Sequence, residues 1–212
     1  MGYSVLILSG FGAASYLLGA VPNGYLIARA KGVDIRTVGS GNIGATNVFR
    51  SIGKGWGILT FAADAVKGFV PAFVFPLLAA RLFGCGHPAA GLLNAALAIA
   101  GHNWPVYLGF KGGKGVATSA GALLGLAPAA VGIGLAVWLA VFLLGRYVSL
   151  ASVAAAAAVP AAGWILYLRQ GWLLPSALTA LGAVIILRHR ANIQRLAAGT
   201  EHRFQFGRKR EP

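Results

Sequence analysis

The sequence predicts an all-α polytopic membrane protein with seven transmembrane helices, its N-terminus outside and its C-terminus in the cytoplasm. Hydrophobic residues make up 58% of the 212 residues and charged residues only 10%, whereas a soluble domain carries about 25% charged residues. A span needs ~20 apolar residues, or a shorter run where neighbouring helices cover it. The apolar segments of this chain suffice for six or seven such spans. Short loops use the rest of the chain, so residues 1–212 are predicted to form a single integral membrane domain.

Seven apolar segments are predicted to be helices, and they cover residues 5–30, 56–82, 88–100, 116–126, 129–144, 150–168 and 172–187. Pro22 and Gly24 predict a kink in the first segment, because proline cannot donate a backbone hydrogen bond. One helix over the fourth and fifth segments would contain 29 residues and measure about 44 Å, which exceeds the ~30 Å hydrocarbon core. Gly125 and Pro128 instead favour a tight turn between these two segments.

The distribution of Lys and Arg predicts the orientation of the helices. With seven spans, 15 of the 18 basic residues fall on one face and only Arg81 and Arg169 on the other, while Lys67 lies within a span. Basic residues gather in cytoplasmic loops, so the basic face is predicted to be cytoplasmic. A merged fourth and fifth helix would move Arg146 and the C-terminal tail to the opposite face, so the asymmetry also favours seven spans.

Charge and composition narrow the classes of partner. The net charge of +14 suits anionic lipids and anionic substrates, and in a membrane protein it does not indicate nucleic-acid binding. The four histidines are dispersed, carboxylates are almost absent and Cys85 is the single cysteine. The sequence therefore predicts no metal site and no intrachain disulfide.

The central stretch, GHNWPVYLGFKGGKGVATS at 101–119, predicts an anion-binding loop. Glycines allow backbone N–H groups to converge on one point, and Lys111 and Lys114 add two positive charges beside Gly112 and Gly113. The following helix, expected to open at Thr118, favours negative charge at its N-terminus. The stretch lacks the spacing of a P-loop. It is interpreted either as a phosphate cradle or as a flexible basic loop against anionic headgroups.

The first polar tract, SGNIGATNVFR at 40–50, offers hydroxyls, amides and one arginine. Thr46 and Asn47 are expected to cap a short helix, and the planar fork of Arg50 suits phosphate oxygens. The tract is therefore either a second anion-binding element or a capped surface loop.

A third cluster, RHRANIQR at 188–195, follows the last apolar segment. If the helix continues, His189 and Asn192 share one face at i, i+3, and Arg188 begins a second stripe. The alternative is a basic patch that flanks the membrane. Ser149, in the remaining cytoplasmic turn, either joins the site or only caps a helix.

The basic face contains no Ser-His-Asp set, no His-x4-Asp motif and no credible general-base carboxylate. A base would have to come from His189 or from a phosphate of the substrate. Asp64 and Lys67 are functional candidates because they lie within a span, although a buried ion pair at a depth away from the cytoplasmic loops explains them equally well. His102, at the start of the central stretch, is a candidate for positioning it.

Together, SGNIGATNVFR at 40–50, GHNWPVYLGFKGGKGVATS at 101–119 and RHRANIQRLAAGTE at 188–201 resemble the bacterial acyl-phosphate-dependent glycerol-3-phosphate acyltransferases of the PlsY type. The resemblance covers essentially the whole chain. It implies a seven-span enzyme of the inner membrane with its active site facing the cytoplasm. Such enzymes move an acyl group from acyl phosphate to the 1-position of glycerol 3-phosphate, which gives lysophosphatidic acid and phosphate in the first step of phospholipid synthesis.

The resemblance also implies roles for residues of all three stretches and for Ser149. The residues expected to be catalytic are Arg50, Lys111, His189 and Asn192. Those expected to bind substrate are Ser40, Gly41, Asn42, Thr46, Gly112, Gly113, Lys114, Ser149 and Arg188. The resemblance implies no cofactor, and it implies that the phosphate of the acyl phosphate is the base.

Two other classes share some of these features. A transporter for a small phosphorylated anion would need polar residues leading across the bilayer, and the outer half offers little besides Asp64, Lys67 and His87. A lipid-binding scaffold would not need three glycine-bearing anion loops. The resemblance implies glycerol 3-phosphate, acyl phosphate and membrane lipids as the partners.

Overall fold

Among residues 2–87 and 89–205, which the computed structural model describes, every regular element is a helix. The chain forms two compact units, residues 1–128 and residues 129–212. The prediction of an all-helical protein is confirmed. The prediction of a single domain over residues 1–212 stays a prediction.

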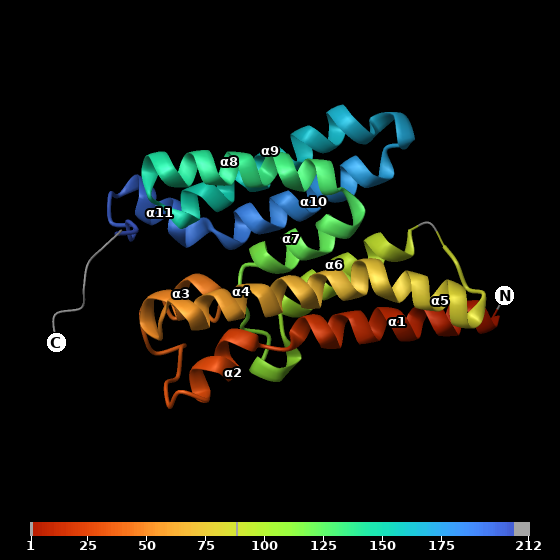
Figure 1. Cartoon of the computed structure of the whole chain (residues 1–212), viewed down its shortest axis with the longest axis horizontal. Helices are drawn as coiled ribbons and strands as arrows, with labels where there is room; N and C mark the ends of the chain where they lie inside the picture. The colour runs from red at the N-terminus through yellow and green to blue at the C-terminus, as the bar shows by residue number, and fades with distance from the viewer. Residues whose placement is uncertain (1, 88, 206–212) are drawn as a thin grey trace. The chain divides into compact units, whose positions relative to one another are not determined.

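The first unit contains four long helices joined by shorter pieces. Its elements are α1 (Gly2–Ala20), α2 (Asn23–Arg29), α3 (Ala45–Ser51), α4 (Lys54–Phe69), a π-helical turn (Val70–Val74), α5 (Phe75–Phe83), α6 (Ala90–Asn103), a 3₁₀ turn (Val106–Leu108) and α7 (Val116–Leu126). Within this unit α1 packs mainly against α6, and α4 packs mainly against α7 (Figure 1). The connection that contains α2 and α3 lies at one end of these helices, and the α5–α6 connection lies at the other.

Glycines bring the paired helices of this unit into close contact. A Cβ atom at Gly19 of α1 would overlap the backbone of Ala98 in α6, and one at Gly121 of α7 would overlap the carbonyl of Ala65 in α4. Lipid tails are as apolar as the side chains, so helices in a membrane associate through such close packing. The small residues of the sequence thus determine which helices pair.

Prolines explain the two irregularities of these helices. The predicted kink is confirmed, because α1 ends at Ala20 and α2 begins after Pro22. Between α4 and α5, Pro71 lies in the π-helical turn, where its missing N–H disturbs the helical ladder. The helix nevertheless continues over the 30 residues Lys54–Phe83.

The second unit consists of α8 (Pro128–Gly145), α9 (Val148–Tyr167), α10 (Leu173–Arg188) and α11 (Arg190–Ala197). The Trp138 indole of α8 donates a hydrogen bond to the Ser152 hydroxyl of α9, at 3.2 Å. Gly182 of α10 lies where a Cβ would come within 2.5 Å of the Ala156 carbonyl of α9. The α8–α9 turn and α11 lie at the same end of this unit (Figure 1).

Each of the seven predicted segments contains a helix, although residue 88, the predicted start of the third, lies outside the described residues. The break between the fourth and fifth is confirmed, since α7 ends at Leu126 and α8 begins at Pro128. By length and composition, four helices among the described residues could cross a membrane, or five if the bent pair α10 and α11 is one span. Helices α6 and α7, with 14 and 11 residues, are shorter than the ~20 residues of a full span. Seven spans and their orientation stay predictions.

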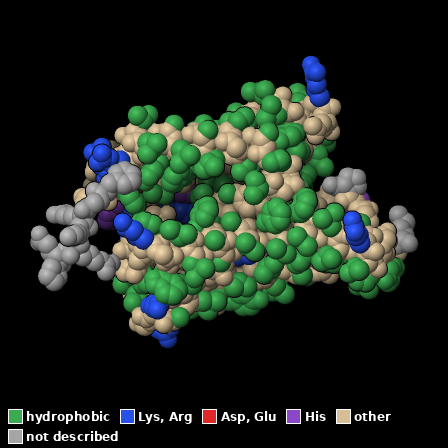
Figure 2. Space-filling model, viewed as in Figure 1, with side chains coloured by type: hydrophobic (Ala, Val, Ile, Leu, Met, Phe, Trp, Pro, Cys, Tyr) green, Lys and Arg blue, Asp and Glu red, His purple; other side chains and the backbone are tan. Residues whose placement is uncertain are grey.

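Hydrophobic side chains cover most of the face shown in Figure 2. Many large apolar side chains are exposed, among them Leu6 at 70%, Leu144 at 84% and Ile165 at 82%. Such a surface suits a lipid environment.

Candidate functional site

The first polar tract folds around the side chain of Asn47. This amide is 4% exposed, and its Nδ2 lies 3.1, 3.0 and 2.9 Å from the carbonyls of Ile35, Val38 and Asn42. Its Oδ1 accepts a hydrogen bond from the backbone N–H of Ser40, at 3.1 Å. The loop is thereby held in one shape, although Ser40 itself is exposed. Sequence reasoning did not place Asn47 at this centre.

The expectation that Thr46 and Asn47 cap the following helix is wrong. Gly44 occupies the N-cap position of α3, without a side-chain cap, because Asn47 faces back into the loop. The side-chain Oδ1 of Asn42 instead accepts a hydrogen bond from the N–H of Gly44, at 2.8 Å, which forms an Asx-turn. Thr46 is exposed at the start of α3, and Arg50 is partly buried in its last turn.

Residues 109–115, here called the glycine loop, lie against the last turn of α6. The N–H of Gly113 donates a hydrogen bond to the carbonyl of His102, at 3.1 Å. A Cβ at Gly112 would overlap that carbonyl, and a Cβ at Gly113 would overlap the His102 ring. Gly115 has a φ of +80°, so it meets the left-handed backbone requirement as well. Gly112, Gly113 and Gly115 are therefore needed for the close contact of this loop with α6.

The glycine loop presents positive charge beside the start of a helix. Lys111 is exposed and Lys114 is partly buried. Helix α7 begins at Val116, the predicted start of the fourth segment, and its first N–H groups have no carbonyl partner within the helix. This combination of cations and N–H donors suits a phosphate. The phosphate cradle itself stays a prediction.

In the second unit, Glu201 gathers three donors. Its Oε1 accepts hydrogen bonds from the hydroxyl of Ser149 and the amide of Asn192, each at 2.8 Å, and its Oε2 accepts one from Nε of Arg195 at 2.7 Å. The capping alternative for Ser149 is wrong, because Tyr147 occupies the N-cap position of α9 and the Ser149 hydroxyl is turned to Glu201. Phe204 returns to the same end, where its N–H donates to the Arg146 carbonyl at 2.7 Å.

Glu201 is charged at neutral pH. Burial raises the pKa of its carboxyl, but the hydrogen bonds from Asn192, Ser149 and Arg195 outweigh burial, so the pKa of Glu201 lies below its usual value. A carboxylate so fully supplied with donors is a weak base and a good anchor. Sequence reasoning missed this role, although Glu201 ends the third motif and is one of only four acidic residues.

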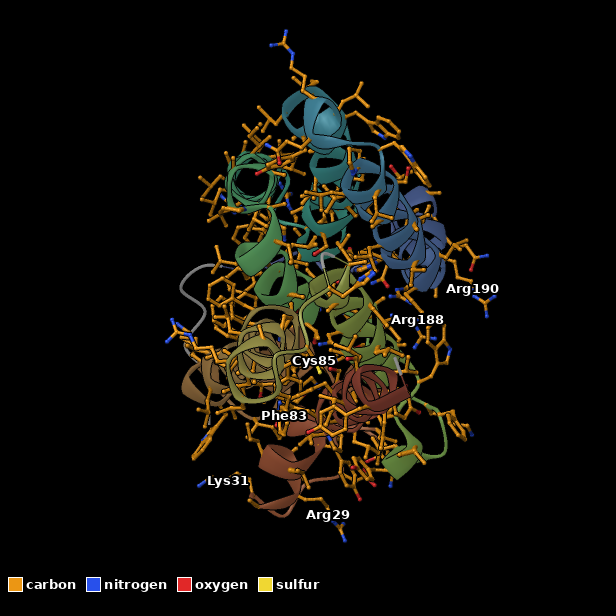
Figure 3. The ribbon with its side chains drawn as sticks, turned by 90° about the vertical axis from the view of Figure 1, so that its right-hand side faces the viewer. Arg29, Lys31, Phe83, Cys85, Arg188 and Arg190 are labelled. Atoms are coloured by element: carbon orange, nitrogen blue, oxygen red, sulfur yellow. The ribbon has the colours of Figure 1, made fainter. Side chains whose placement is uncertain are left out.

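The helix does not continue straight through the third cluster, because α10 and α11 meet at His189 with a bend of 57°. His189 and Asn192 are nevertheless adjacent, because the backbone N–H of Asn192 donates a hydrogen bond to the carbonyl of His189, at 2.8 Å. The bend interrupts the predicted stripe from Arg188. Arg188 lines a cavity of about 340 Å³ with Leu187 and Arg190, and Arg190 reaches away from the helices (Figure 3).

The His189 ring is held in one tautomer. The ring is buried, at 3% exposed, and its Nδ1 lies 2.8 Å from the carbonyl of Ile185. A carbonyl oxygen can only accept, so Nδ1 carries the proton, and in the neutral ring Nε2 then has the lone pair.

The structure therefore groups the predicted residues within each unit. In the first unit, Ser40, Gly41 and Asn42 belong to the loop held by Asn47, while Lys111, Gly112, Gly113 and Lys114 form the glycine loop. In the second unit, Ser149 and Asn192 share the Glu201 carboxylate, and His189 adjoins them through Asn192.

The family model described as glycerol-3-phosphate acyltransferase matches residues 10–199. The chain belongs to the glycerol-3-phosphate acyltransferase family. A family member from Desulforudis audaxviator is 49% identical over 196 residues, which cover 91% of this chain and 93% of that protein. One from Aquifex aeolicus is 45% identical over 192 residues, which cover 90% and 95%.

Solved structures of a member of the family share the fold. The glycerol 3-phosphate form of PlsY (YgiH), an integral membrane glycerol 3-phosphate acyltransferase, has 42% identity and a TM-score of 0.81, covering 93% of this chain and 96% of that chain. The lysophosphatidic acid form has 41% identity and a TM-score of 0.79, with 93% and 95% covered. The resemblance inferred from the three motifs is confirmed, and the chain is an integral membrane member of this acyltransferase family.

Proposed function

We propose that the protein transfers a fatty acyl group from acyl phosphate to the 1-position of glycerol 3-phosphate, forming lysophosphatidic acid and inorganic phosphate. The glycine loop carries this proposal, because its lysines and the N-terminus of α7 provide binding for a phosphate dianion. The two crystal forms of PlsY, named for glycerol 3-phosphate and lysophosphatidic acid, are consistent with this acceptor and this product.

The proposed step is an acyl substitution. The 1-hydroxyl oxygen of glycerol 3-phosphate forms a bond to the acyl carbonyl carbon, and the bond between that carbon and the phosphate oxygen breaks. Phosphate leaves with the electron pair and accepts the hydroxyl proton, so it departs as hydrogen phosphate. No cofactor takes part in this balance.

Each cluster has a proposed part in the step. Arg50, in the last turn of α3, and Lys111, in the glycine loop, bind phosphate oxygens, because both are cations beside other polar groups. Ser40, Gly41, Asn42, Thr46, Gly112, Gly113, Lys114, Ser149 and Arg188 are proposed to bind the substrates. His189 is the third proposed catalytic residue, with its ring held by the Ile185 carbonyl. Asn192, fixed by Glu201, is the fourth proposed catalytic residue.

The weak basicity of Glu201 supports the choice of substrate phosphate as the proton acceptor. Its carboxylate is occupied by three donors, and its pKa lies below the usual value. The leaving phosphate gains basicity as its bond to the acyl carbon breaks, so it can accept the proton where the proton is released.

We further propose that the enzyme crosses the bacterial inner membrane seven times, with its active site on the cytoplasmic side. The asymmetry of Lys and Arg supports this orientation. Glycerol 3-phosphate would then be drawn from the cytosol by the basic loops, while the acyl chain stays in the membrane.

A comparison of acyl donors tests the proposal. The purified protein in lipid nanodiscs is given glycerol 3-phosphate with acyl phosphate, acyl-CoA or acyl carrier protein, and lysophosphatidic acid is measured. Of the three donors, only acyl phosphate should give lysophosphatidic acid. Product from acyl-CoA or acyl carrier protein, or no product from any donor, would overturn the proposed reaction.

A further inference from the structure

The buried pair Asp64 and Lys67 ties α4 to the break between α1 and α2. Asp64 is 2% exposed and Lys67 is 4% exposed, and Nζ of Lys67 lies 2.9 Å from Oδ1 of Asp64. Lys67 also donates to the carbonyl of Val21 at 2.7 Å, and the Asn23 amide donates to Asp64 at 3.0 Å. Both charged side chains are thus held by contacts within the first unit.

The same carboxylate faces His102 at the end of α6. Nδ1 of the His102 ring lies 3.8 Å from Oδ1 of Asp64, a distance longer than a hydrogen bond and an ion pair only when the imidazole is protonated, and the residue is 5% exposed. The expectation that the depth of Asp64 and Lys67 keeps them away from the cytoplasmic loops is therefore wrong. His102 connects the pair to the glycine loop.

His102 supports the glycine loop with both its backbone and its ring. Its carbonyl accepts the N–H of Gly113 at 3.1 Å and is the atom that a side chain at Gly112 would strike. The far edge of the ring, at Nε2 and Cε1, is the surface that a side chain at Gly113 would strike. A displacement of the ring therefore displaces the loop that carries Lys111.

We propose that His102 is a positioning residue for the glycine loop, anchored by the Asp64–Lys67 pair. A buried ion pair contributes little net stability, because desolvation offsets the attraction. A fixed charge beside the ring does, however, set its orientation in a medium of low dielectric constant. The pair thus holds the imidazole, and the imidazole holds Gly112 and Gly113 where the loop can meet a phosphate. The binding of a phosphate by this loop rests on the proposed function.

The test uses variants that are matched in shape. The double variant Asp64→Asn with Lys67→Met removes both charges, so neither is left buried alone. His102→Leu removes the polar ring, and a third protein combines all three changes. Thr60→Val is the control, because Thr60 is buried one turn from Asp64 on α4 and its hydroxyl bonds only the local carbonyl of Trp56, at 2.8 Å.

Hydrogen exchange of the amides of residues 109–115 is measured on ligand-free protein in nanodiscs. The neutral-pair variant and His102→Leu should each speed this exchange about tenfold. The combined variant should be no faster than the faster of the two, because coupled residues are not additive. Thr60→Val should match the wild type. Unchanged loop exchange, additive effects, or an increase spread equally over α1, α4 and α6 would overturn the proposal.

Kinetics provide the second measurement. Misplacing the loop should raise the KM for glycerol 3-phosphate about tenfold in the neutral-pair variant and leave kcat within about twofold, since ground-state phosphate binding is lost. A KM equal to that of the wild type contradicts the positioning role. If neither the wild type nor any variant transfers an acyl group, the proposed function fails. The hydrogen-exchange measurement still decides the role of His102 in that case.

Discussion

Lys111 and Arg50 are the two side chains on which phosphate binding depends most in this account. Alanine at either position should lower kcat/KM at least about 100-fold, because a charged donor to the reacting phosphates is lost. Membrane insertion should be intact, since Lys111 is exposed in a loop and Arg50 lies in the short helix α3. The measurement is steady-state kinetics on protein of equal yield.

Lys31→Ala is the matched control for these two variants. Lys31 is an exposed cation that lies over the ring of Trp56, 4.2 Å from its centroid, and it belongs to neither polar cluster. Its kcat/KM should stay near that of the wild type. A near-normal kcat/KM for Lys111→Ala or Arg50→Ala would remove that residue from the site.

Glu201 should make stability depend on pH. Its folded-state pKa lies below its usual value, so its contribution is present above the unfolded-state pKa of ~4.3 and is lost as the pH falls through the lowered value. Glu201→Gln should therefore lower the Tm at pH 7, with a smaller difference from the wild type at pH 4 and below. Thermal unfolding in detergent at these pH values measures the effect.

Asp34→Asn is the control for this pH experiment. Hydrogen bonds from Arg36 lower the pKa of Asp34 to about 2, but the pair is on the surface, where such contacts add little. The Tm of Asp34→Asn should stay close to the wild type at both pH values. A Tm difference for Glu201→Gln that grows as the pH falls would contradict the role assigned to Glu201.

Sequence motifs identified most of the residues of both clusters but not what holds them. Glycines and lysines in one loop predict an anion-binding element, because backbone N–H groups and positive charges converge there. Asn47 and Glu201 were missed as organisers, because their roles depend on contacts with residues that are distant in sequence, such as Ile35 and Ser149. A single sequence shows residue types and spacing, and these do not specify such contacts.

At the level of the helices, close packing through glycine should dominate stability. A Cβ at Gly121 of α7 would overlap the carbonyl of Ala65 in α4, whereas a Cβ at the exposed Gly132 of α8 meets no atom within 4 Å. Gly121→Ala should destabilise the protein by about 2 kcal/mol or more, since backbone must move. Gly132→Ala should be neutral or stabilising by up to about 1 kcal/mol.

Thermal unfolding of the two glycine variants, in the same detergent, makes this comparison. Both are Gly→Ala changes inside helices, so propensity acts alike in both and packing separates them. Equal Tm values for the two variants would contradict the close approach of α4 and α7.

Helix positions were largely predictable, because apolar runs and prolines act locally. Residues 116–126 were predicted as a helix and form α7 with the same bounds. The bend at His189 was not predicted, since no proline or glycine marks it and the polar contacts of Asn192 and Arg195 with Glu201 come from further along the chain. Local pattern thus located the helices, and tertiary contacts decided where one of them bends.

At the scale of the whole molecule, the seven-span arrangement can be tested by labelling. In a Cys85→Ala background, a single cysteine replaces Lys31, Arg81, Arg146 or Arg169. All four side chains are exposed, so a reagent can reach each position. In intact cells an impermeant maleimide should label positions 81 and 169 and should not label 31 or 146 until the membrane is opened. Labelling of 31 or 146 in intact cells would contradict the orientation.

In the proposed reaction the acyl group moves to glycerol 3-phosphate and the phosphate of the donor is released. The most direct measurement uses acyl phosphate labelled with ³²P, unlabelled glycerol 3-phosphate and the purified protein. The account predicts that every lysophosphatidic acid formed is accompanied by one labelled inorganic phosphate, with no label in the lipid. Label in lysophosphatidic acid, or lipid product without release of labelled phosphate, would contradict it.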